Sequence, residues 1–238
     1  MLNIIYEDDE LLVVNKPAGL VCHPAKNGEL SGLIGRARLH LKGSAPPHLV
    51  NRLDRETSGV VIIAKNSGVA GGLGKILENR AVEKEYLAIV HGHVAAERGI
   101  IDAPLGRDEH SPVAGKDCVR SDGSPSQTEF WVERRFSRGE GKFSLLRILP
   151  RTGRKHQIRI HLAHVGHPVA GDKLYGGDED LYLALVENRL TGAQRARLIF
   201  ENHALHARAV RFVWRDRPME FSCQPEPWFT DFANTDER

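Results

Sequence analysis

Apolar residues recur along the chain with two different spacings, and each spacing indicates one kind of secondary structure. Residues 60–64 (VVIIA) form a short, mostly β-branched apolar run, which is typical of a buried strand. Residues 83–90 alternate instead, so that Tyr86, Ala88 and Val90 share one face of a strand. Runs of these two kinds predict strands at residues 4–6, 11–15, 60–64, 83–90, 127–135, 143–149, 204–214 and 219–223.

Helical spacing occurs between several of these strands. In residues 156–165, Ile158, Leu162 and Val165 recur at the spacing of one helix face. The same period predicts helices at residues 30–41, 67–79, 156–165 and 181–197, with a break in the last one near Thr191 and Gly192. Residues 104–125 are rich in Gly, Pro, Asp and Ser, so we expect a long functional or mobile loop there.

The order of these elements indicates the fold class. Strand pairs are separated by helices without the regular strand–helix–strand repeat of a parallel sheet. We therefore expect an α+β fold with a long mixed, mostly antiparallel sheet and flanking helices. The chain has 238 residues, which is within the size range of one domain. We expect residues 1–238 to form a single domain, with loop or insertion regions at residues 104–125 and 178–203.

Composition narrows the class of protein further. Hydrophobic residues make up 41% of the chain and charged residues 27%, which is ordinary for a globular protein with a full core. No run of about 18 apolar residues occurs, so we expect no membrane span. The N-terminal stretch lacks the basic start and long apolar run of a signal peptide. The three cysteines form no CxxC pair, so we expect free thiols in a reducing compartment, the cytoplasm.

Charge is distributed unevenly, although the formal net charge is only +2. Residues 147–159 (RILPRTGRKHQIR) contain five Lys or Arg residues and no acidic residue. A local basic stripe of this kind favours contact with a polyanion. A solvated face without any partner would have the same composition, so charge alone leaves both interpretations open.

Residues 50–65 (VNRLDRETSGVVIIAK) combine a charged turn with the apolar strand that follows it. A turn mounted on a core strand holds polar side chains against a rigid element, as catalytic groups require. Asp54 lies between Arg52 and Arg55 in this turn. A nucleophilic carboxylate must be ionised, and a neighbouring guanidinium favours the ionised form. Asp54 is therefore the candidate for the chemistry, although a carboxylate that only caps the turn would look the same.

Several common catalytic motifs are absent from the sequence. It contains no GxSxG, no HExxH and no complete phosphate-binding P-loop. Among the 12 histidines, His161 and His164 would share a helix face, but no nearby Cys, Asp or Glu completes a set of metal ligands. We therefore expect neither a metal nor a cofactor.

Four segments, in the expected order, resemble one known family. Residues 51–59 (NRLDRETSG) are similar to the HRLDxxTSG motif of the RluA family of RNA pseudouridine synthases. Residues 6–17 (YEDDELLVVNKP) resemble the opening strand pair of that family, and residues 84–92 (KEYLAIVHG) resemble the strand that carries its active-site tyrosine. Residues 152–175 (TGRKHQIRIHLAHVGHPVAGDKLY) are similar to its TGRxHQIRxHL and GHPxxGDxxY signatures. The resemblance covers most of the chain.

The resemblance implies a role for each matched residue. Asp54 corresponds to the catalytic aspartate and Arg159 to the arginine that pairs with it. Tyr86 corresponds to the tyrosine whose ring packs on the target base and whose hydroxyl is placed for proton transfer. Arg52 corresponds to the arginine that enters the RNA stack when the base leaves it. The other predicted RNA-binding residues are Arg55, Arg154, Lys155 and His156, and among them Arg154 and Lys155 are expected to hold backbone phosphates.

The resemblance also implies a fold and an activity. The fold is the pseudouridine synthase fold with a central active-site cleft, and the activity is isomerisation of a specific uridine to pseudouridine in 23S rRNA or tRNA. Asp54 would attack the ribose or abstract its 2′ proton, and the sequence leaves both routes open. We expect RNA as the only partner, without DNA, a membrane or a second subunit. The alternatives are a catalytically silent RNA-binding module on the same fold and a metal-dependent RNA hydrolase that uses His161 and His164.

Two features depart from the family pattern. Asn51 stands where the motif usually has His, and because an amide cannot titrate, a proton-transfer role at this position is in doubt. Many relatives also carry an N-terminal S4 RNA-binding domain, whereas this sequence starts at the first catalytic strand. RNA selection is therefore expected to depend on the catalytic domain itself, in particular on residues 104–125 and 181–197.

Overall fold

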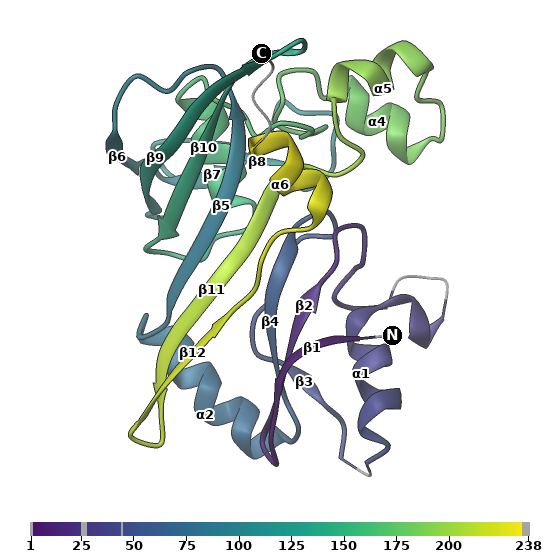
Figure 1. The fold of residues 1–238 in the computed structure, drawn as a ribbon, viewed down its shortest axis with the longest axis vertical. Helices are drawn as coiled ribbons and strands as arrows, with labels where there is room; N and C mark the ends of the chain where they lie inside the picture. Colours follow the sequence, from purple (N-terminus) through teal and green to yellow (C-terminus); the bar gives the residue numbers. More distant parts are fainter. Residues whose placement is uncertain (1, 25–27, 44, 235–238) are drawn as a thin grey trace. The chain divides into compact units, whose positions relative to one another are not determined.

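The structure is a computed structural model that describes residues 2–24, 28–43 and 45–234 (Figure 1). Its internal contacts divide the chain into two compact units. The first unit contains Met1–Tyr86 and His206–Pro227, and the second contains Leu87–Leu205 and Trp228–Arg238. The expectation of a single domain stays a prediction.

The first unit is built on a mixed sheet. Its strands follow the order β1-β2-β4-β11-β5, with β12 also paired to β11 and β3 also paired to β4. The strands are β1 (Asn3–Glu7), β2 (Leu11–Lys16), β3 (His48–Leu49), β4 (Ser58–Ala64), the start of β5 (Glu83–His91), β11 (Leu205–Trp214) and β12 (Arg217–Ser222). The helices are a 3-10 turn (Glu29–Ser31), α1 (Leu33–Leu41) and α2 (Ser67–Glu78). Of the pairs with a described register, only β11 with β4 is parallel.

The core of the first unit explains the apolar run in β4. In β2, Leu12 belongs to a buried cluster with Leu33 of α1, whereas the adjacent Leu11 belongs to a second cluster with Leu73 of α2. The neighbouring strand β4 contributes to both clusters in the same alternating way, and all seven of its residues are buried. A strand that is covered on both faces has no need of polar positions, so it appears as a continuous apolar run.

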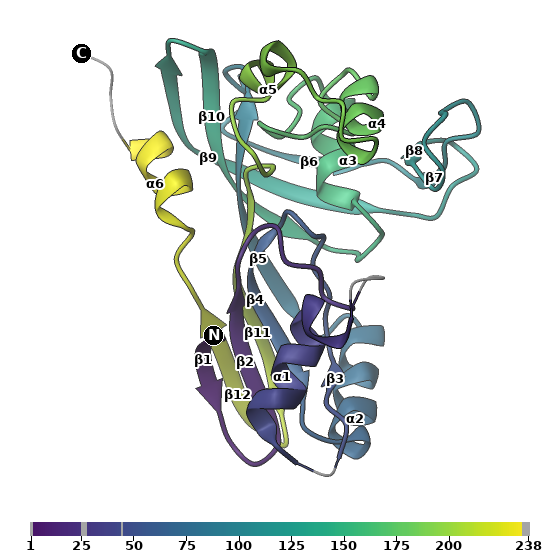
Figure 2. The ribbon, with the colours of Figure 1, turned by 90° about the vertical axis from the view of Figure 1, so that its right-hand side faces the viewer.

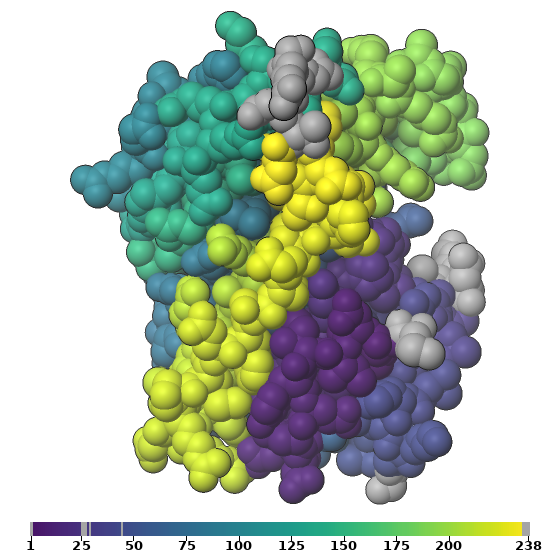
Figure 3. Space-filling model, in the orientation of Figure 1, coloured from purple at the N-terminus to yellow at the C-terminus, as the bar shows by residue number. Residues whose placement is uncertain are grey.

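Strands β1 and β12 lie side by side at the surface of the first unit (Figures 2 and 3). Tyr6 of β1 packs against Phe221 of β12, with the ring centroids 5.1 Å apart. The N-terminal strand is therefore held to its unit by β2 on one side and by this aromatic contact on the other.

The second unit contains the strand order β5-β10-β9-β6 and a separate two-stranded sheet of β7 with β8. Its further strands are β6 (Arg98–Asp102), β7 (Leu105–Arg107), β8 (Asp117–Val119), β9 (Gln127–Arg138) and β10 (Gly141–Pro150). Its helices are α3 (Gln157–His164), α4 (Asp180–Val186), α5 (Gly192–Leu198) and, at the boundary with the first unit, α6 (Pro227–Asn234).

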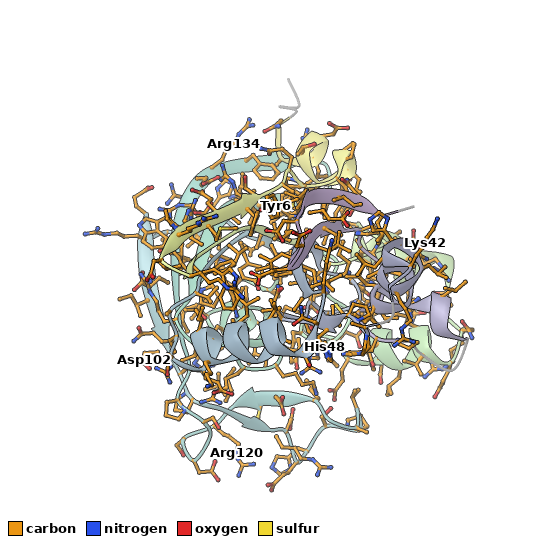
Figure 4. All side chains as sticks on the ribbon, turned by 90° about the horizontal axis from the view of Figure 1, so that it is seen from below. Tyr6, Lys42, His48, Asp102, Arg120 and Arg134 are labelled. Carbon is orange, nitrogen blue, oxygen red and sulfur yellow. The ribbon has the colours of Figure 1, made fainter. Side chains whose placement is uncertain are left out.

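The expected α+β class and the mostly antiparallel pairing are confirmed, and the expected helices and strands are present within a few residues of their predicted ends. Residues 104–125 are a correction, because they contain the β7–β8 hairpin rather than only a loop (Figure 4, where Arg120 is labelled beside it). Each of its strands has three residues, which is too short to produce a periodic signal. No helix in the described part of the chain is long and apolar enough to cross a membrane.

Candidate active site

Asp54 lies in the first unit, in the loop of residues 50–57 between β3 and β4, here called the Asp54 loop. The start of this loop is paired to β4. The amide of Val50 donates to the carbonyl of Ile62 at 2.9 Å. The Asn51 side chain continues this pairing, since its Nδ2 donates to the Val60 carbonyl at 3.1 Å and its Oδ1 accepts from the Ile62 amide at 2.8 Å.

These two hydrogen bonds give Asn51 a structural role. A carboxamide presents a donor and an acceptor side by side, which matches the carbonyl and amide that a strand presents along one edge. The two nitrogens of an imidazole point in diverging directions and cannot form this pair of bonds with adjacent backbone groups. The departure from the family motif at Asn51 is therefore a local solution for anchoring the Asp54 loop.

The middle of the loop is held by a buried ammonium group. Nζ of Lys16 donates to the carbonyls of Arg55 at 3.0 Å, Leu20 at 2.8 Å and Pro17 at 2.9 Å, and Lys16 is 0% exposed. Burial lowers the pKa of Lys16 to about 8, while the negative charges of neighbouring acidic groups, Asp54 among them, oppose the shift. Three carbonyl acceptors satisfy all the donors of the ammonium, which explains how a charged lysine is tolerated in the interior.

Two further contacts complete the support of the Asp54 loop. Sγ of Cys22 lies 3.4 Å from both the amide nitrogen and the carbonyl oxygen of Leu53. Where the loop enters β4, Oγ of Ser58 lies 2.8 Å from Nδ1 of His206 in β11. Gly59 follows with φ 116°, and a Cβ at this position would lie 2.2 Å from the Ala207 carbonyl oxygen. Only glycine fits this close approach of two parallel strands.

Asp54 itself is half-buried, and Tyr86 of β5 is its neighbour in the first unit. Burial raises the pKa of the Tyr86 hydroxyl, and the negative charge of Asp54 raises it further. The phenol therefore stays protonated at neutral pH. Asp54 and Tyr86 together supply a carboxylate, a protonated hydroxyl and an aromatic ring within the first unit.

Arg159 lies in the second unit, on α3, and is 7% exposed. Its Nε donates to Oδ2 of Asp172 at 2.6 Å and its Nη2 donates to Oδ1 at 2.9 Å. The Tyr175 ring lies against the guanidinium, with its centroid 5.0 Å from Cζ. Burial opposes the charge on Asp172, but the Arg159 guanidinium nevertheless holds the pKa of that carboxyl well below its usual range. Asp172 and Tyr175 lie within the GDxxY signature, but the sequence predicted no role for either residue.

The basic loop of residues 151–156 precedes α3 and is shaped by Gln157. Its Oε1 accepts from Oγ1 of Thr152 at 2.7 Å and from the amide of Arg154 at 3.0 Å. Its Nε2 donates to the Gln127 carbonyl at 2.9 Å and to Oγ1 of Thr128 at 3.0 Å. All the hydrogen-bonding capacity of this buried amide is used, so the loop has a defined shape.

The predicted RNA-binding side chains differ in how they are held. Arg52 and Arg154 are exposed, and neither side chain forms a hydrogen bond or ion pair with any residue that the structure describes. Arg55 is exposed and donates from Nε to the Gly19 carbonyl at 3.2 Å. Lys155 donates to the Gly115 carbonyl in the β7–β8 hairpin. His156, with φ 55°, lies with its Nδ1 3.0 Å from the Tyr175 hydroxyl.

His161 does not fit the metal-dependent alternative. It is 0% exposed, and its two ring nitrogens lie 2.9 Å from Oγ1 of Thr128 and 2.9 Å from the Ala103 carbonyl oxygen. Both nitrogens are thus used within the fold, whereas His164 is exposed. Within residues 2–24, 28–43 and 45–234, no three His, Cys, Asp or Glu side chains are grouped so that they could hold a metal ion. These contacts argue against the alternative in which His161 and His164 bind a metal.

The structure therefore groups the predicted site residues in two sets. Asp54, Tyr86, Arg52 and Arg55 belong to the first unit, and the residues from Arg154 to Arg159 belong to the second. The pairing of Asp54 with Arg159 stays a prediction from the sequence.

Comparison with known proteins connects these features to one family. Residues 10–164 match the family model of RNA pseudouridylate synthases. A protein of Aquifex aeolicus named an uncharacterized RNA pseudouridine synthase is 41% identical over 181 residues, which are 74% of this chain and 56% of that protein. The dual-specificity RNA pseudouridine synthase RluA of Vibrio parahaemolyticus is 40% identical over 74% of this chain and 70% of its own length. The chain thus spans little more than half of the Aquifex relative.

Solved structures agree with this assignment. Human RNA pseudouridylate synthase domain containing 1 has a TM-score of 0.76 and 28% identity, covering 97% of this chain and 86% of the human one. Human RNA pseudouridylate synthase domain containing 4 has a TM-score of 0.74 and 25% identity, covering 96% and 90%. The chain belongs to the RNA pseudouridylate synthase family, an isomerase family, and both the resemblance to its RluA-type members and the expected fold are confirmed.

Proposed function

We propose that this chain converts uridine to pseudouridine in structured RNA and that Asp54 is the catalytic carboxylate. The observation that carries the proposal is the Asp54 loop. Side chains from distant parts of the first unit hold its backbone at Leu53 and Arg55, on both sides of Asp54. A catalytic group needs this kind of support, because small errors in its position lower the rate strongly.

The reaction exchanges one bond for another within the nucleotide. The bond between ribose C1′ and uracil N1 breaks, the uracil rotates, and its C5 bonds to C1′. The proton on C5 is lost and N1 gains a proton, so the reaction needs neither an oxidant nor a reductant. Asp54 either attacks the ribose or removes its 2′ proton, and both routes require an ionised carboxylate. The buried Lys16 ammonium contributes a positive charge that favours this form.

The other predicted residues take supporting roles in this proposal. The Tyr86 ring packs on the target base, and its protonated hydroxyl is a donor beside Asp54. Arg159 supplies the counter-charge that the sequence predicts for Asp54. Arg52 fills the stack after the base has left it, which its exposed side chain allows.

RNA is the proposed partner, and rRNA or tRNA is the proposed class of substrate. The exposed Arg154 on the basic loop is suited to a backbone phosphate, because Gln157 fixes the loop and leaves the guanidinium in solvent. A relative named ribosomal large subunit pseudouridine synthase D supports rRNA, and one named dual-specificity RNA pseudouridine synthase supports RNA as the partner.

Replacement of the carboxylate tests the proposal. RNA from a strain that lacks the gene is incubated with the wild-type chain, Asp54→Asn, Asp54→Ala and the control Asp9→Asn, and pseudouridine is mapped. We expect both Asp54 variants to be at least about 1,000-fold slower, because the reacting group is lost. Asp9 is an exposed carboxylate of the same unit, and its variant should match the wild type.

Two results would contradict the proposal. Full activity in Asp54→Asn would show that the Asp54 carboxylate takes no part in the reaction. A wild-type chain that binds RNA but forms no pseudouridine in any RNA would support the catalytically silent module instead.

A further inference from the structure

The Arg159 side chain is held by two groups that constrain different directions. Ion pairs at a protein surface join flexible side chains, and holding them in one geometry has an entropic cost. Asp172, in contrast, has 0% side-chain exposure and binds the guanidinium through two hydrogen bonds. This contact fixes the edge of the planar group. The Tyr175 ring, 5.0 Å from Cζ, lies against the same guanidinium, so the two groups together restrict its direction and its rotation.

The Asp172 carboxylate is itself held by the backbone. Its Oδ1 accepts from the amides of Leu174 at 2.9 Å and Tyr175 at 3.0 Å, in addition to Arg159. Every described partner of the carboxylate is a donor, so the group acts as a rigid acceptor. Burying two opposite charges rarely stabilises a fold more than apolar residues of the same size would. A buried pair of this quality therefore points to a role beyond stability.

Tyr175 also connects the guanidinium to the basic loop and to the β7–β8 hairpin. Its hydroxyl lies 3.0 Å from Nδ1 of His156 in the basic loop and accepts from the amide of Asp117 in β8 at 3.5 Å. The ring thus contacts Arg159, while its hydroxyl contacts the loop and the hairpin. Tyr175 therefore supports both the Arg159 guanidinium and the basic loop.

We propose that Asp172 and Tyr175 are positioning residues that orient the Arg159 guanidinium for the isomerisation. This inference rests on the proposed function. Asp172 sets the direction of the guanidinium through its edge, and Tyr175 restricts its rotation. Preorganised charge accelerates a reaction because no reorientation is needed when the transition state forms.

A double-mutant cycle on the full chain tests this inference. Asp172→Asn keeps the shape of the side chain but replaces one accepting oxygen with an NH2 group. This NH2 group faces groups that are themselves hydrogen-bond donors, namely Arg159 or the backbone amides. We expect kcat to fall about 100-fold and KM for the RNA to stay within about threefold. Asp172→Asn should have little further effect on kcat in an Arg159→Met background, because positioning residues act through the residue that they position. Glu97→Gln, which removes a carboxylate paired with Arg135 at 2.8 Å in the same unit, is the matched control and should leave kcat unchanged.

Variants of Tyr175 test the same inference even if Asp172→Asn does not fold. Tyr175→Leu removes the ring and should lower kcat about tenfold, whereas Tyr175→Phe keeps the ring and should lower it less than about threefold. Multiplicative losses in the Arg159→Met background, or wild-type kcat in both Asp172→Asn and Tyr175→Leu, would overturn the inference. The absence of pseudouridine formation by the wild-type chain would instead overturn the proposed function.

Discussion

Asp54 in the first unit and Arg159 in the second, two charged residues of the proposed function, are held in opposite ways. In the first unit, the supporting contacts reach the backbone around Asp54, at Leu53 and Arg55, and come from Cys22 and Lys16. In the second unit, the support reaches the side chain itself, because Asp172 binds the Arg159 guanidinium directly.

This difference agrees with the role proposed for each group. A carboxylate that attacks ribose or removes a proton must keep an oxygen available, so fixing its backbone is the compatible form of support. An arginine that supplies charge forms no covalent bond, so one edge of its guanidinium can be used for positioning. Each of the following predictions tests one side of this contrast, beginning with the largest expected effect.

Lys16→Met should give the largest loss of stability. It leaves the carbonyls of Arg55, Leu20 and Pro17 without their buried donor, and unsatisfied buried acceptors are costly. We expect the free energy of unfolding to fall by about 4 kcal/mol in urea titrations. The exposed Lys75 provides the control, since Lys75→Met should change stability by less than about 0.5 kcal/mol. Equal stability of the two variants would show that Lys16 does not support the Asp54 loop.

Acid should weaken the support of the Asp54 loop through His206, whose Nδ1 lies 2.8 Å from Oγ of Ser58 where the loop enters β4. Burial lowers the pKa of His206 from 6.5 to about 4, against the opposing effect of its hydrogen bond to the Cys223 carbonyl, and the nearby Arg208 lowers it further. Between these values the unfolded chain binds a proton that the folded chain does not bind. Stability is therefore lost as pH falls from about 6.5 to about 4, by about 3 kcal/mol in total for this group.

The measurement is the free energy of unfolding across that pH range for the wild type and His206→Gln. The variant should show a shallower fall, with the remainder coming from other buried histidines such as His161. The Arg159–Asp172 pair should keep its charge throughout, since the pKa of Asp172 lies well below its usual range. If the free energy of unfolding fell equally with pH in the wild type and in His206→Gln, His206 would not be the source of the acid sensitivity.

Asn51→Leu should have a smaller effect on stability but a clear effect on the reaction. It removes the hydrogen bonds to Val60 and Ile62, and we expect about 2 kcal/mol of lost stability. Because these bonds anchor the start of the Asp54 loop, kcat should fall about tenfold while KM for the RNA changes little. Gln157→Leu is the matched change in the second unit, and there KM should rise instead. The same kinetic pattern in both variants would argue against separate roles for the two loops.

Arg154→Ala and Arg52→Ala should give the smallest effects and should differ in kind. Loss of one phosphate contact at Arg154 reduces the slope of log affinity against log salt by about 1. Arg52→Ala should change this slope by less than half as much and should act mainly on kcat, because Arg52 is proposed to fill the stack. The exposed Arg98 of β6 is the control, and its alanine variant should leave both quantities unchanged.

Local patterns in the sequence determined the elements that are long or buried on both faces. The apolar run in β4, the alternation in β5 and the helical period of α2 each depend only on neighbouring residues, so their positions could be predicted. The β7–β8 hairpin, β6 and α6 were missed. The hairpin strands have three residues each, which is too short for a periodic signal. Asp54 could be found in the same local way, from a charged turn next to a core strand.

Only the tertiary structure decided how the candidate groups are supported. Lys16 reaches the Arg55 carbonyl across 39 residues, and Ser58 meets His206 across 148 residues. No periodicity records such contacts, because they depend on where the backbone brings distant atoms together. Asn51 shows the distinction well. The sequence marked it as a departure from the family motif, and only the strand edge of β4 beside it explains why a carboxamide serves there.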